Sequence, residues 1–253
     1  MDPVQVIPCL DIKEGRVVKG VRFVDLVDAR DPAEAAGAYS EQGADLVVFL
    51  DIAATVEGRK TRLEWVRKVA GAVTVPFAVG GGISTLADMK ELFEMGAAKV
   101  SINTAAVRDP GLVEAAAKEF GSERLVVAVD GEKDEATGRL EVVVSGGNRR
   151  ADRELVEWCK EVESLGAGEI LLTSKDADGT KDGYDIPMTK AAADAVSIPV
   201  VASGGAGTLD HMSDAVTEAG AAAVLAASVF HFGELTVRQV KEHLRDKGIA
   251  VNL

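Results

Sequence analysis

The fold of this chain is indicated first by the stretch Ile198-Pro199-Val200-Val201-Ala202-Ser203-Gly204-Gly205-Ala206-Gly207-Thr208. A short apolar run gives way here to small residues where a helix is expected to begin, an arrangement that presents backbone N–H groups to a phosphate. An earlier copy reads Val75-Pro76-Phe77-Ala78-Val79-Gly80-Gly81-Gly82-Ile83-Ser84-Thr85 and aligns without a gap at a shift of 123 residues (199 − 76). The chain therefore reads as two related halves, about 1–122 and 123–253.

The repeat extends beyond the glycines. Residues 96–100 (Gly-Ala-Ala-Lys-Val) correspond to 220–224 (Gly-Ala-Ala-Ala-Val), and 43–48 correspond to 166–171. An aspartate closes the first apolar run of each half, Asp11 after 7–10 and Asp130 after 126–129. Because a repeat of this kind fixes the architecture, we expect Asp11 and Asp130 to occupy equivalent, opposed positions.

Composition limits the protein class. No linker divides the 253 residues, which favours one closed domain. The sequence shows neither an apolar run of membrane-spanning length nor a signal peptide. Cys9 and Cys159 are far apart and are expected to stay reduced in a cytoplasm, without a disulfide or metal site. A net charge of −13 argues against nucleic-acid binding, so anions must be bound locally, by backbone dipoles and a few lysines.

Short apolar runs alternate with segments of helical periodicity, such as Leu63, Val66, Val69 and Ala70. This alternation predicts a (β/α)8 barrel of the TIM type, with its chemistry at the carboxyl ends of the strands. The eight expected strands are Val4–Leu10, Leu46–Leu50, Phe77–Val79, Lys99–Ile102, Leu125–Val129, Glu169–Thr173, Val200–Ala202 and Ala223–Ala226.

Three strands are followed by unusually long connections. Residues 13–30, which carry Lys19, are expected to form a loop that closes over a ligand. Residues 174–185 are rich in Asp, Gly, Thr and Lys and are expected to form a polar lid. Residues 131–145 have the pattern of a small hairpin that turns at Thr137-Gly138.

Small and polar residues at the strand ends suggest two phosphate sites. One would be formed by Gly80–Gly82 with Asn103 and Thr104, and the other by Ser203–Gly205 with Ala227 and Ser228. Two sites on opposite sides of one rim would hold a substrate phosphorylated at both ends. The alternative is that these glycines only permit tight turns between strand and helix.

Asp11 and Asp130 would lie on either side of the reactive middle of such a substrate, where one gives a proton while the other takes one. The alternatives are a helix N-cap, or an ion pair with Lys13 or Lys133. The three histidines show no ligand spacing, so neither a metal site nor a histidine base is expected. They are His211, His231 and His243.

Several motifs closely resemble those of the cyclase subunits of imidazole glycerol phosphate synthase, from histidine biosynthesis. The resemblance covers essentially the whole chain. The sister isomerase of that pathway shares the half-barrel plan and the paired aspartates, but not the first-strand motif or the Gly-Tyr-Asp lid. The matching segments are Cys9–Gly20, Val79–Ile83, Lys99–Ala106, Gly168–Ser174, Asp178–Asp185 and Ala202–Gly207.

The resemblance implies a lyase that converts N′-(5′-phosphoribulosyl)-formimino-AICAR-phosphate and ammonia into imidazole glycerol phosphate and AICAR phosphate. It implies Asp11 and Asp130 as the acid–base pair, Lys19 closing over the substrate, and no metal or organic cofactor. It also implies a glutaminase subunit docked at the amino-terminal face of the barrel, with ammonia passing through the core. The substrate-binding residues would be Gly82, Asn103 and Thr104 at one phosphate, and Thr173, Asp178, Gly179, Ser203, Gly204, Gly205, Ala227 and Ser228 toward the other.

The chain departs from the family pattern at the bottom of the barrel. Gln5 and Leu46 occupy two places of a charged gate, while Lys99 and Glu169 remain and should pair with each other. An acidic residue usual before Lys99 is replaced by Ala98. We therefore hypothesise that coupling to the glutaminase is weakened.

The lids differ as well, as in a divergent, reconstructed or redesigned member. Ala177 stands where an arginine is usual, which removes a bidentate phosphate contact and puts substrate affinity in question. Two alternatives to the cyclase stay open: an aminoaldose isomerase, which would need no ammonia, and a phosphate-binding barrel that has lost turnover. The unusual residues of the first lid are Arg22, Asp25, Val27 and Arg30.

Overall fold

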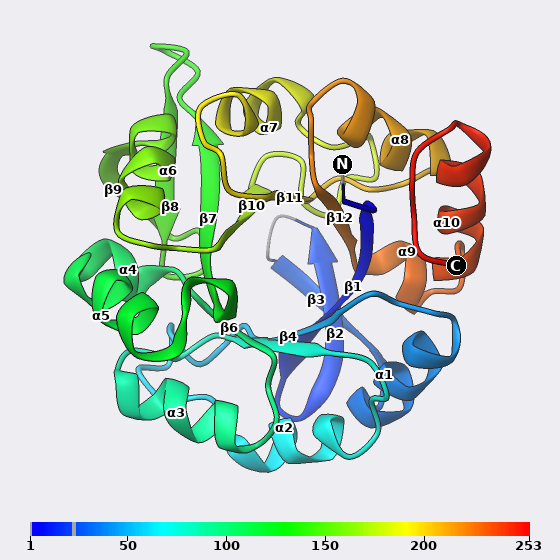
Figure 1. Cartoon of the computed structure of the whole chain (residues 1–253), viewed down its shortest axis with the longest axis horizontal. Helices are drawn as coiled ribbons and strands as arrows, with labels where there is room; N and C mark the ends of the chain where they lie inside the picture. The colour runs from blue at the N-terminus through cyan, green and yellow to red at the C-terminus, as the bar shows by residue number, and fades with distance from the viewer. Residues whose placement is uncertain (1, 22–23) are drawn as a thin grey trace.

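The apolar runs of the sequence form the parallel strands of a closed barrel, with helices around it (Figure 1). The computed structural model describes the backbone of residues 2–21 and 24–253, and the side chains of these residues outside 19–30. The barrel strands follow the order β1-β4-β5-β6-β7-β10-β11-β12, and the pairing of β12 with β1 closes the ring. The expected (β/α)8 fold is confirmed.

Each strand expected from the sequence is present, and several run further toward their carboxyl ends than expected. The barrel strands are β1 (Gln5–Lys13), β4 (Val47–Asp51), β5 (Phe77–Gly80), β6 (Lys99–Ile102), β7 (Leu125–Lys133), β10 (Glu169–Ser174), β11 (Val200–Ser203) and β12 (Ala223–Ala226).

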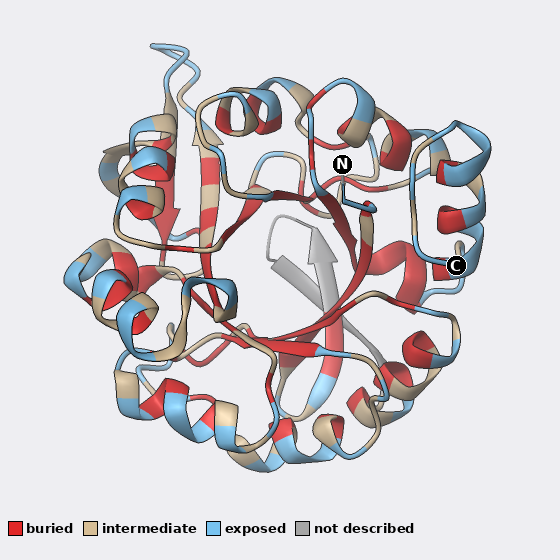
Figure 2. Ribbon diagram, viewed as in Figure 1, coloured by how far each residue is buried: buried red, intermediate tan, exposed pale blue. Residues whose placement is uncertain are grey.

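The helices cover the outside of the barrel, and most of them bury their inward faces and expose their outward ones (Figure 2). None in the described part of the chain is long and apolar enough to cross a membrane. The helices are α1 (Pro32–Glu41), α2 (Leu63–Ala70), α3 (Leu86–Glu94), α4 (Thr104–Arg108), α5 (Gly111–Phe120), α6 (Leu155–Ser164), α7 (Ile186–Ala193), α8 (Leu209–Thr217), α9 (Ser228–His231) and α10 (Val237–Asp246), with a 3-10 turn at Ser122–Arg124.

Strand alternation divides the core into two layers. On β1, Val6 and Leu10 point outward into the layer shared with the helices, whereas Ile7 and Cys9 point into the barrel. Because successive side chains of a strand face opposite ways, the next inward position after Cys9 is Asp11. The same alternation on β7, with residues 126 and 128 inward, turns Asp130 into the barrel.

Two of the long connections are β-structure rather than loops. Residues 13–30, expected to be a loop, contain the strands β2 (Arg16–Val21) and β3 (Val24–Arg30), which pair antiparallel, so the expectation of a loop was wrong. The hairpin expected at 131–145 is confirmed by the pairing of β7 with β8 (Leu140–Val144). A further strand, β9 (Arg149–Glu154), pairs with β8 and was not expected.

Candidate active site

The two aspartates lie on opposite sides of the barrel mouth. Three strands separate β1 from β7 in either direction around the ring: β4, β5 and β6 one way, and β12, β11 and β10 the other. Asp11 and Asp130 are each near the carboxyl end of their strand and turn inward. The opposed placement expected from the repeat is therefore present.

Asp11 is buried, with 9% of its surface exposed, and accepts a hydrogen bond from the Cys9 thiol at 3.2 Å. The side chains of Cys9 and Asp11 both line a cavity at the mouth. Because Asp11 lies inside β1 and Asp130 inside β7, neither caps a helix, and that alternative is wrong. Cys9 was not among the predicted site residues, although its position two residues before Asp11 on one strand indicates a shared face.

The environment of Asp130 favours its protonated form. Desolvation at the mouth, and next the nearby Asp178 carboxylate, raise the pKa of Asp130 to about 7. The side-chain amide of Asn103 donates to Oδ2 of Asp130 at 2.8 Å and opposes this rise. A carboxyl group that exchanges its proton near neutral pH is suited to acid–base catalysis.

The cavity at the mouth brings together one of the two predicted residue sets. It leaves about 540 Å³ free of atoms, part of it continuous with solvent. Leu50 and Leu171 are among the hydrophobic side chains that line it. The predicted residues that line it are Asp11, Thr173, Asp178, Gly179, Ser203, Gly204, Gly205, Ala227 and Ser228.

The glycines of this cavity also have a packing role. Gly205 has a φ of 98°, and a Cβ there would collide with the carbonyl oxygen of Gly183. The two residues are joined by a hydrogen bond from the Gly183 N–H to the Gly205 carbonyl at 2.8 Å. A Cβ on Gly204 would meet the carbonyl oxygen of Ser174 at 2.8 Å. The tight-turn explanation therefore applies here alongside phosphate binding.

The other predicted set lies apart from this cavity, and its members contact other protein groups. The Gly82 N–H points at the Thr55 hydroxyl at 3.4 Å, and the Thr104 hydroxyl accepts from the Ser145 N–H at 3.0 Å. Asn103 is directed at Asp130. The Lys19 side chain lies outside the described residues.

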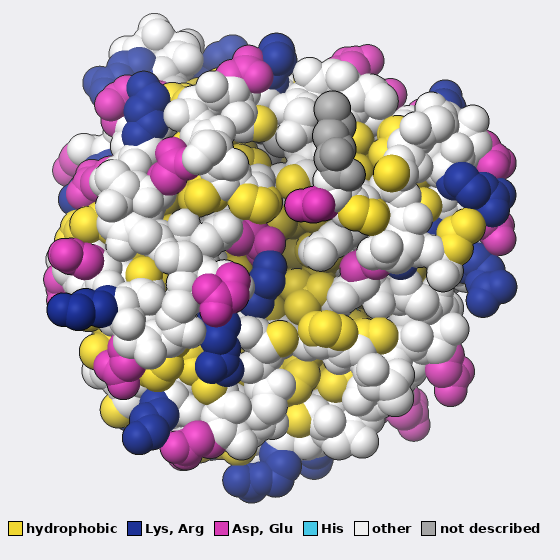
Figure 3. Space-filling model, viewed as in Figure 1, with side chains coloured by type: hydrophobic (Ala, Val, Ile, Leu, Met, Phe, Trp, Pro, Cys, Tyr) yellow, Lys and Arg dark blue, Asp and Glu magenta, His cyan; other side chains and the backbone are white. Residues whose placement is uncertain are grey.

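An ion pair at the opposite end of the barrel matches the sequence expectation. Lys99 and Glu169, at the first residues of β6 and β10, pair at 2.6 Å. Leu46, which corresponds to Glu169 in the sequence repeat, is buried inside the barrel with 4% of its surface exposed. On the face where the chain begins, apolar side chains gather near the centre beside acidic and basic groups (Figure 3).

The described residues contain no group of three or more His, Cys, Asp or Glu side chains placed to hold a metal ion. Two of the histidines make hydrogen bonds within or between helical segments. His231 on α9 shares a hydrogen bond of 2.6 Å with the Tyr39 hydroxyl, and His211 accepts from the Thr208 N–H at the start of α8.

Comparison with known proteins gives the family. The chain matches the family described as histidine biosynthesis protein over residues 5–236. It is 55% identical over 247 residues to the imidazole glycerol phosphate synthase subunit HisF of Anoxybacillus flavithermus, which covers 98% of each chain. The corresponding subunit of Geobacillus thermodenitrificans is 54% identical over the same shares, and that of Prochlorococcus marinus is 54% identical over 96% of this chain and 95% of its own.

These matches extend over nearly the whole barrel, including both aspartate-bearing strands, and do not favour the isomerase or the inactive-barrel alternatives. The chain therefore belongs to the histidine biosynthesis protein family, as a cyclase subunit of the imidazole glycerol phosphate synthase type.

Proposed function

We propose that Asp11 and Asp130 carry out acid–base catalysis in a cyclase-lyase reaction that consumes ammonia. The substrates are N′-(5′-phosphoribulosyl)-formimino-AICAR-phosphate and ammonia, and the products are imidazole glycerol phosphate, AICAR phosphate and one molecule of water. The observation that carries the proposal is the pair of inward carboxyl groups on strands β1 and β7, which face each other across one mouth.

The two phosphates anchor the ends of the substrate. One end binds in the cavity lined by Gly204, Gly205 and Ser228, where backbone N–H groups supply the dipoles that an acidic protein needs to hold an anion. The other end binds near Gly82, Asn103 and Thr104, with Lys19 closing over the substrate. Anchored at both ends, the reactive middle lies between the two carboxyl groups, and positioning of this kind contributes much of the rate.

Addition of ammonia to a carbonyl carbon requires one proton to reach the oxygen and one to leave the nitrogen. Asp130, whose pKa is raised to about 7, holds a proton at neutral pH often enough to donate it. Asp11, on the other side, accepts the proton that leaves. The oxygen then leaves as water, the new nitrogen attacks the formimino carbon to close the ring, and the bond from that carbon to the nitrogen of AICAR phosphate breaks. A proton must leave the attacking nitrogen and another must reach the departing nitrogen, so the same two carboxyl groups are needed again. No metal or organic cofactor takes part in this scheme.

The test is the steady-state rate with ammonium as nitrogen donor. Asp11→Asn and Asp130→Asn should each lower it by about 10²-fold or more, because general acid–base catalysis contributes about 10²–10⁴-fold. Asp194→Asn, at the exposed end of α7, is the matched control and should keep the rate of the unaltered protein. Saturable substrate binding without product would contradict the proposal, and turnover without ammonia would favour the isomerase.

The relatives are named as subunits, which supports a partner for this chain as well. We propose that the partner is a glutaminase that docks at the strand-start end of the barrel, and that ammonia passes through the core. With Gln5 and Leu46 in two places of the gate, Lys99 and Glu169 pair with each other, and coupling is weakened. The rate with glutamine and a glutaminase subunit, divided by the rate with ammonium, measures this coupling. A ratio near one would contradict weakened coupling.

The cytoplasm is the proposed location. Cys9 and Cys159 are buried and not joined to each other, as expected where thiols stay reduced. Fractionation of the native host, with the enzyme followed by its ammonia-dependent activity, would test this location.

A further inference from the structure

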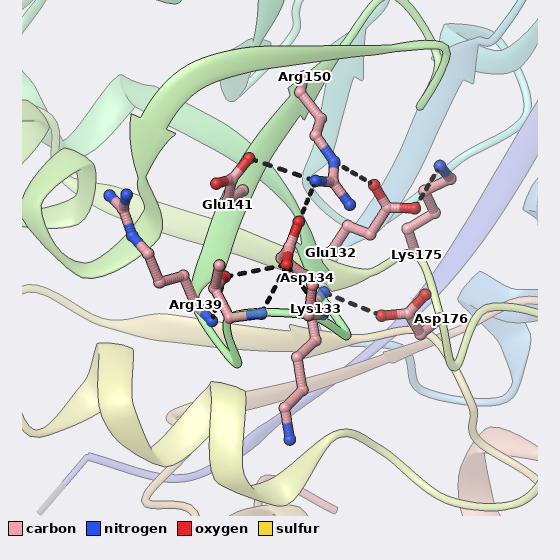
Figure 4. A network of polar contacts seen from close by, with 10 residues as sticks. Glu132, Lys133, Asp134, Arg139, Glu141, Arg150, Lys175 and Asp176 are labelled. Carbon is pink, nitrogen blue, oxygen red and sulfur yellow. Dashed lines mark hydrogen bonds and ion pairs between the residues drawn. The ribbon is translucent and has the colours of Figure 1, made fainter.

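An ion pair joins the hairpin beyond Asp130 to the lid beyond Thr173. Glu132 lies on β7 two residues after Asp130, and its Oε1 accepts from Nζ of Lys175 at 2.8 Å (Figure 4). Lys175 is the first residue after β10. The pair therefore connects the elements that follow two adjacent strands of the barrel mouth.

Further contacts hold the same junction. The Lys175 N–H donates to the Gly131 carbonyl at 2.9 Å, and the Lys133 N–H donates to Oδ2 of Asp176 at 3.0 Å. From β9, Arg150 approaches the second oxygen of Glu132 at 3.2 Å (Figure 4). The Lys175 hydrogen bond, and after it Arg150, keep the pKa of Glu132 below its usual range, so this carboxylate stays charged.

The lid that Lys175 begins carries Asp178 to the active site. No helix or strand lies between the end of β10 at Ser174 and the start of α7 at Ile186, so the lid is held by its individual contacts. Asp178 is buried, with 5% of its surface exposed, and lines the cavity with Asp11. Its carboxylate acts on Asp130 as a like charge. Near its other end, the lid is held by the hydrogen bond from the Gly183 N–H to the Gly205 carbonyl.

We propose that Glu132 and Lys175 are positioning residues, which set the distance between the Asp178 lid and Asp130 and thereby tune the catalytic carboxyl. The proposal rests on the proposed function of Asp130. Neither side chain lines the cavity, so both act through the lid. The side chains of Lys175 and Glu132 are 26% and 20% exposed, so the pair is partly buried, and contact with solvent reduces its contribution to global stability. We expect its main effect on the local placement of the lid.

The decisive variant is Lys175→Met, which keeps the length of the side chain and removes its charge. Loss of a nearby positive charge by itself raises the pKa of a carboxyl group. Release of the lid lowers the pKa of Asp130, because Asp178 moves away and water reaches Asp130. Among the residues whose side chains the structure describes, Asp178 from the lid is the charged group that acts on Asp130, while Asp11 lies on β1 across the ring and Glu132 two residues further along β7. The proposal predicts that the pKa of Asp130 falls, against the direct effect of the charge.

The measurement is a carbon-13 NMR titration of the aspartate carboxyl groups, with Asp130→Asn used to assign the signal, together with kcat and KM for ammonium-dependent turnover. We expect the Asp130 pKa to fall and kcat to drop about tenfold, as expected from misplacement of a catalytic group. Lys160→Met, which removes an exposed pair with Glu157 on α6, is the control and should change neither. An unchanged or raised Asp130 pKa in Lys175→Met overturns the proposal.

A conservative variant checks the role of the pair. Lys175→Arg keeps the positive charge and a donor for Glu132, and should retain most of the kcat and the Asp130 pKa of the unaltered protein. A loss in Lys175→Arg as large as that in Lys175→Met would contradict the proposal. The titration does not depend on turnover. If the unaltered protein shows no ammonia-dependent rate, the proposed function fails, while a fall in the Asp130 pKa still supports the positioning role.

Discussion

The side-chain amide of Asn103 donates to Oδ2 of Asp130 at 2.8 Å, from the residue that precedes α4 to the strand beside it. This hydrogen bond stabilises the ionised carboxylate, whereas desolvation and the Asp178 charge favour the protonated form. Desolvation is the largest effect, and the pKa of Asp130 is raised to about 7. Asn103, predicted as a phosphate ligand, thus also contacts the proposed catalytic carboxyl.

Asp178→Asn should move the pH profile of the reaction. Removal of a like charge lowers the pKa of Asp130, so the loss of activity that follows its ionisation should begin at lower pH than in the unaltered protein. The measurement is kcat between pH 5 and pH 9 with the concentration of unprotonated ammonia held constant. Asp194→Asn, remote from the mouth, serves as the control. An Asp178→Asn profile that overlays that of the unaltered protein would refute the electrostatic coupling.

Asp130→Asn should stabilise the protein at alkaline pH. Between the ordinary aspartate pKa of about 3.9 and the folded value of about 7, the folded protein binds more protons than the unfolded chain. The stability due to this group therefore falls as pH rises through that window and stays low above it. Asparagine avoids that loss, and Tm should rise by about 2–4 °C at pH 8, the shift produced by about 1 kcal/mol in a domain of this size. The gain should be smaller at pH 5. Equal gains at both pH values would contradict the assignment.

Gly205→Ala should damage the second phosphate site. The residue has a φ of 98° and its missing Cβ leaves room for the Gly183 carbonyl, so alanine adds backbone strain and displaces the lid. We expect KM to rise about tenfold or more, with weaker inhibition by inorganic phosphate. Gly248→Ala is the matched control, because that glycine also has a positive φ, of 82°, but nothing lies near its Cβ position. It should lose about 1 kcal/mol of stability without a change in KM. Similar KM values in both variants would sink this interpretation.

Lys241→Met should destabilise the closure of the barrel. Lys241 on α10 pairs with Asp45 at 2.9 Å and donates to the Gly43 carbonyl at 2.6 Å, and both charged side chains are buried, 5% and 7% exposed. Asp45 in turn accepts from the Val6 N–H at 2.8 Å, at the start of β1. Removal of one partner leaves a buried unpaired charge, which costs about 3–5 kcal/mol. Urea unfolding measures the loss.

The matched control for that variant is Lys190→Met, which removes an exposed pair with Asp194 on α7. Exposed pairs at this spacing contribute about 0.3–0.5 kcal/mol, so its unfolding midpoint should hardly move. If the two variants lose similar amounts of stability, burial of the Lys241 pair has no special importance.

The barrel could be predicted from the sequence alone. Its apolar runs alternate with helical segments and repeat at a shift of 123 residues, and strand periodicity turns every second residue, including Asp11 and Asp130, to the same face. These signals are local or nearly so, and they are strong where strands are buried on both sides. The pairing of Lys99 with Glu169 was also predicted, from the family resemblance, which places both in a charged gate that here lacks two of its members.

The contacts and electrostatics of the barrel mouth could not be predicted in this way, because they depend on long-range packing. The β2–β3 hairpin, the third strand β9, the Cys9 bond to Asp11 and the junction of Glu132 with Lys175 join residues whose separation depends on how loops pack. The raised pKa of Asp130 has the same origin, since desolvation and the distance to Asp178 exist only once β7 and β10 lie side by side. Sequence periodicity fixes which way a side chain points from its strand, whereas its burial and the charges around it depend on residues that are far away in the chain.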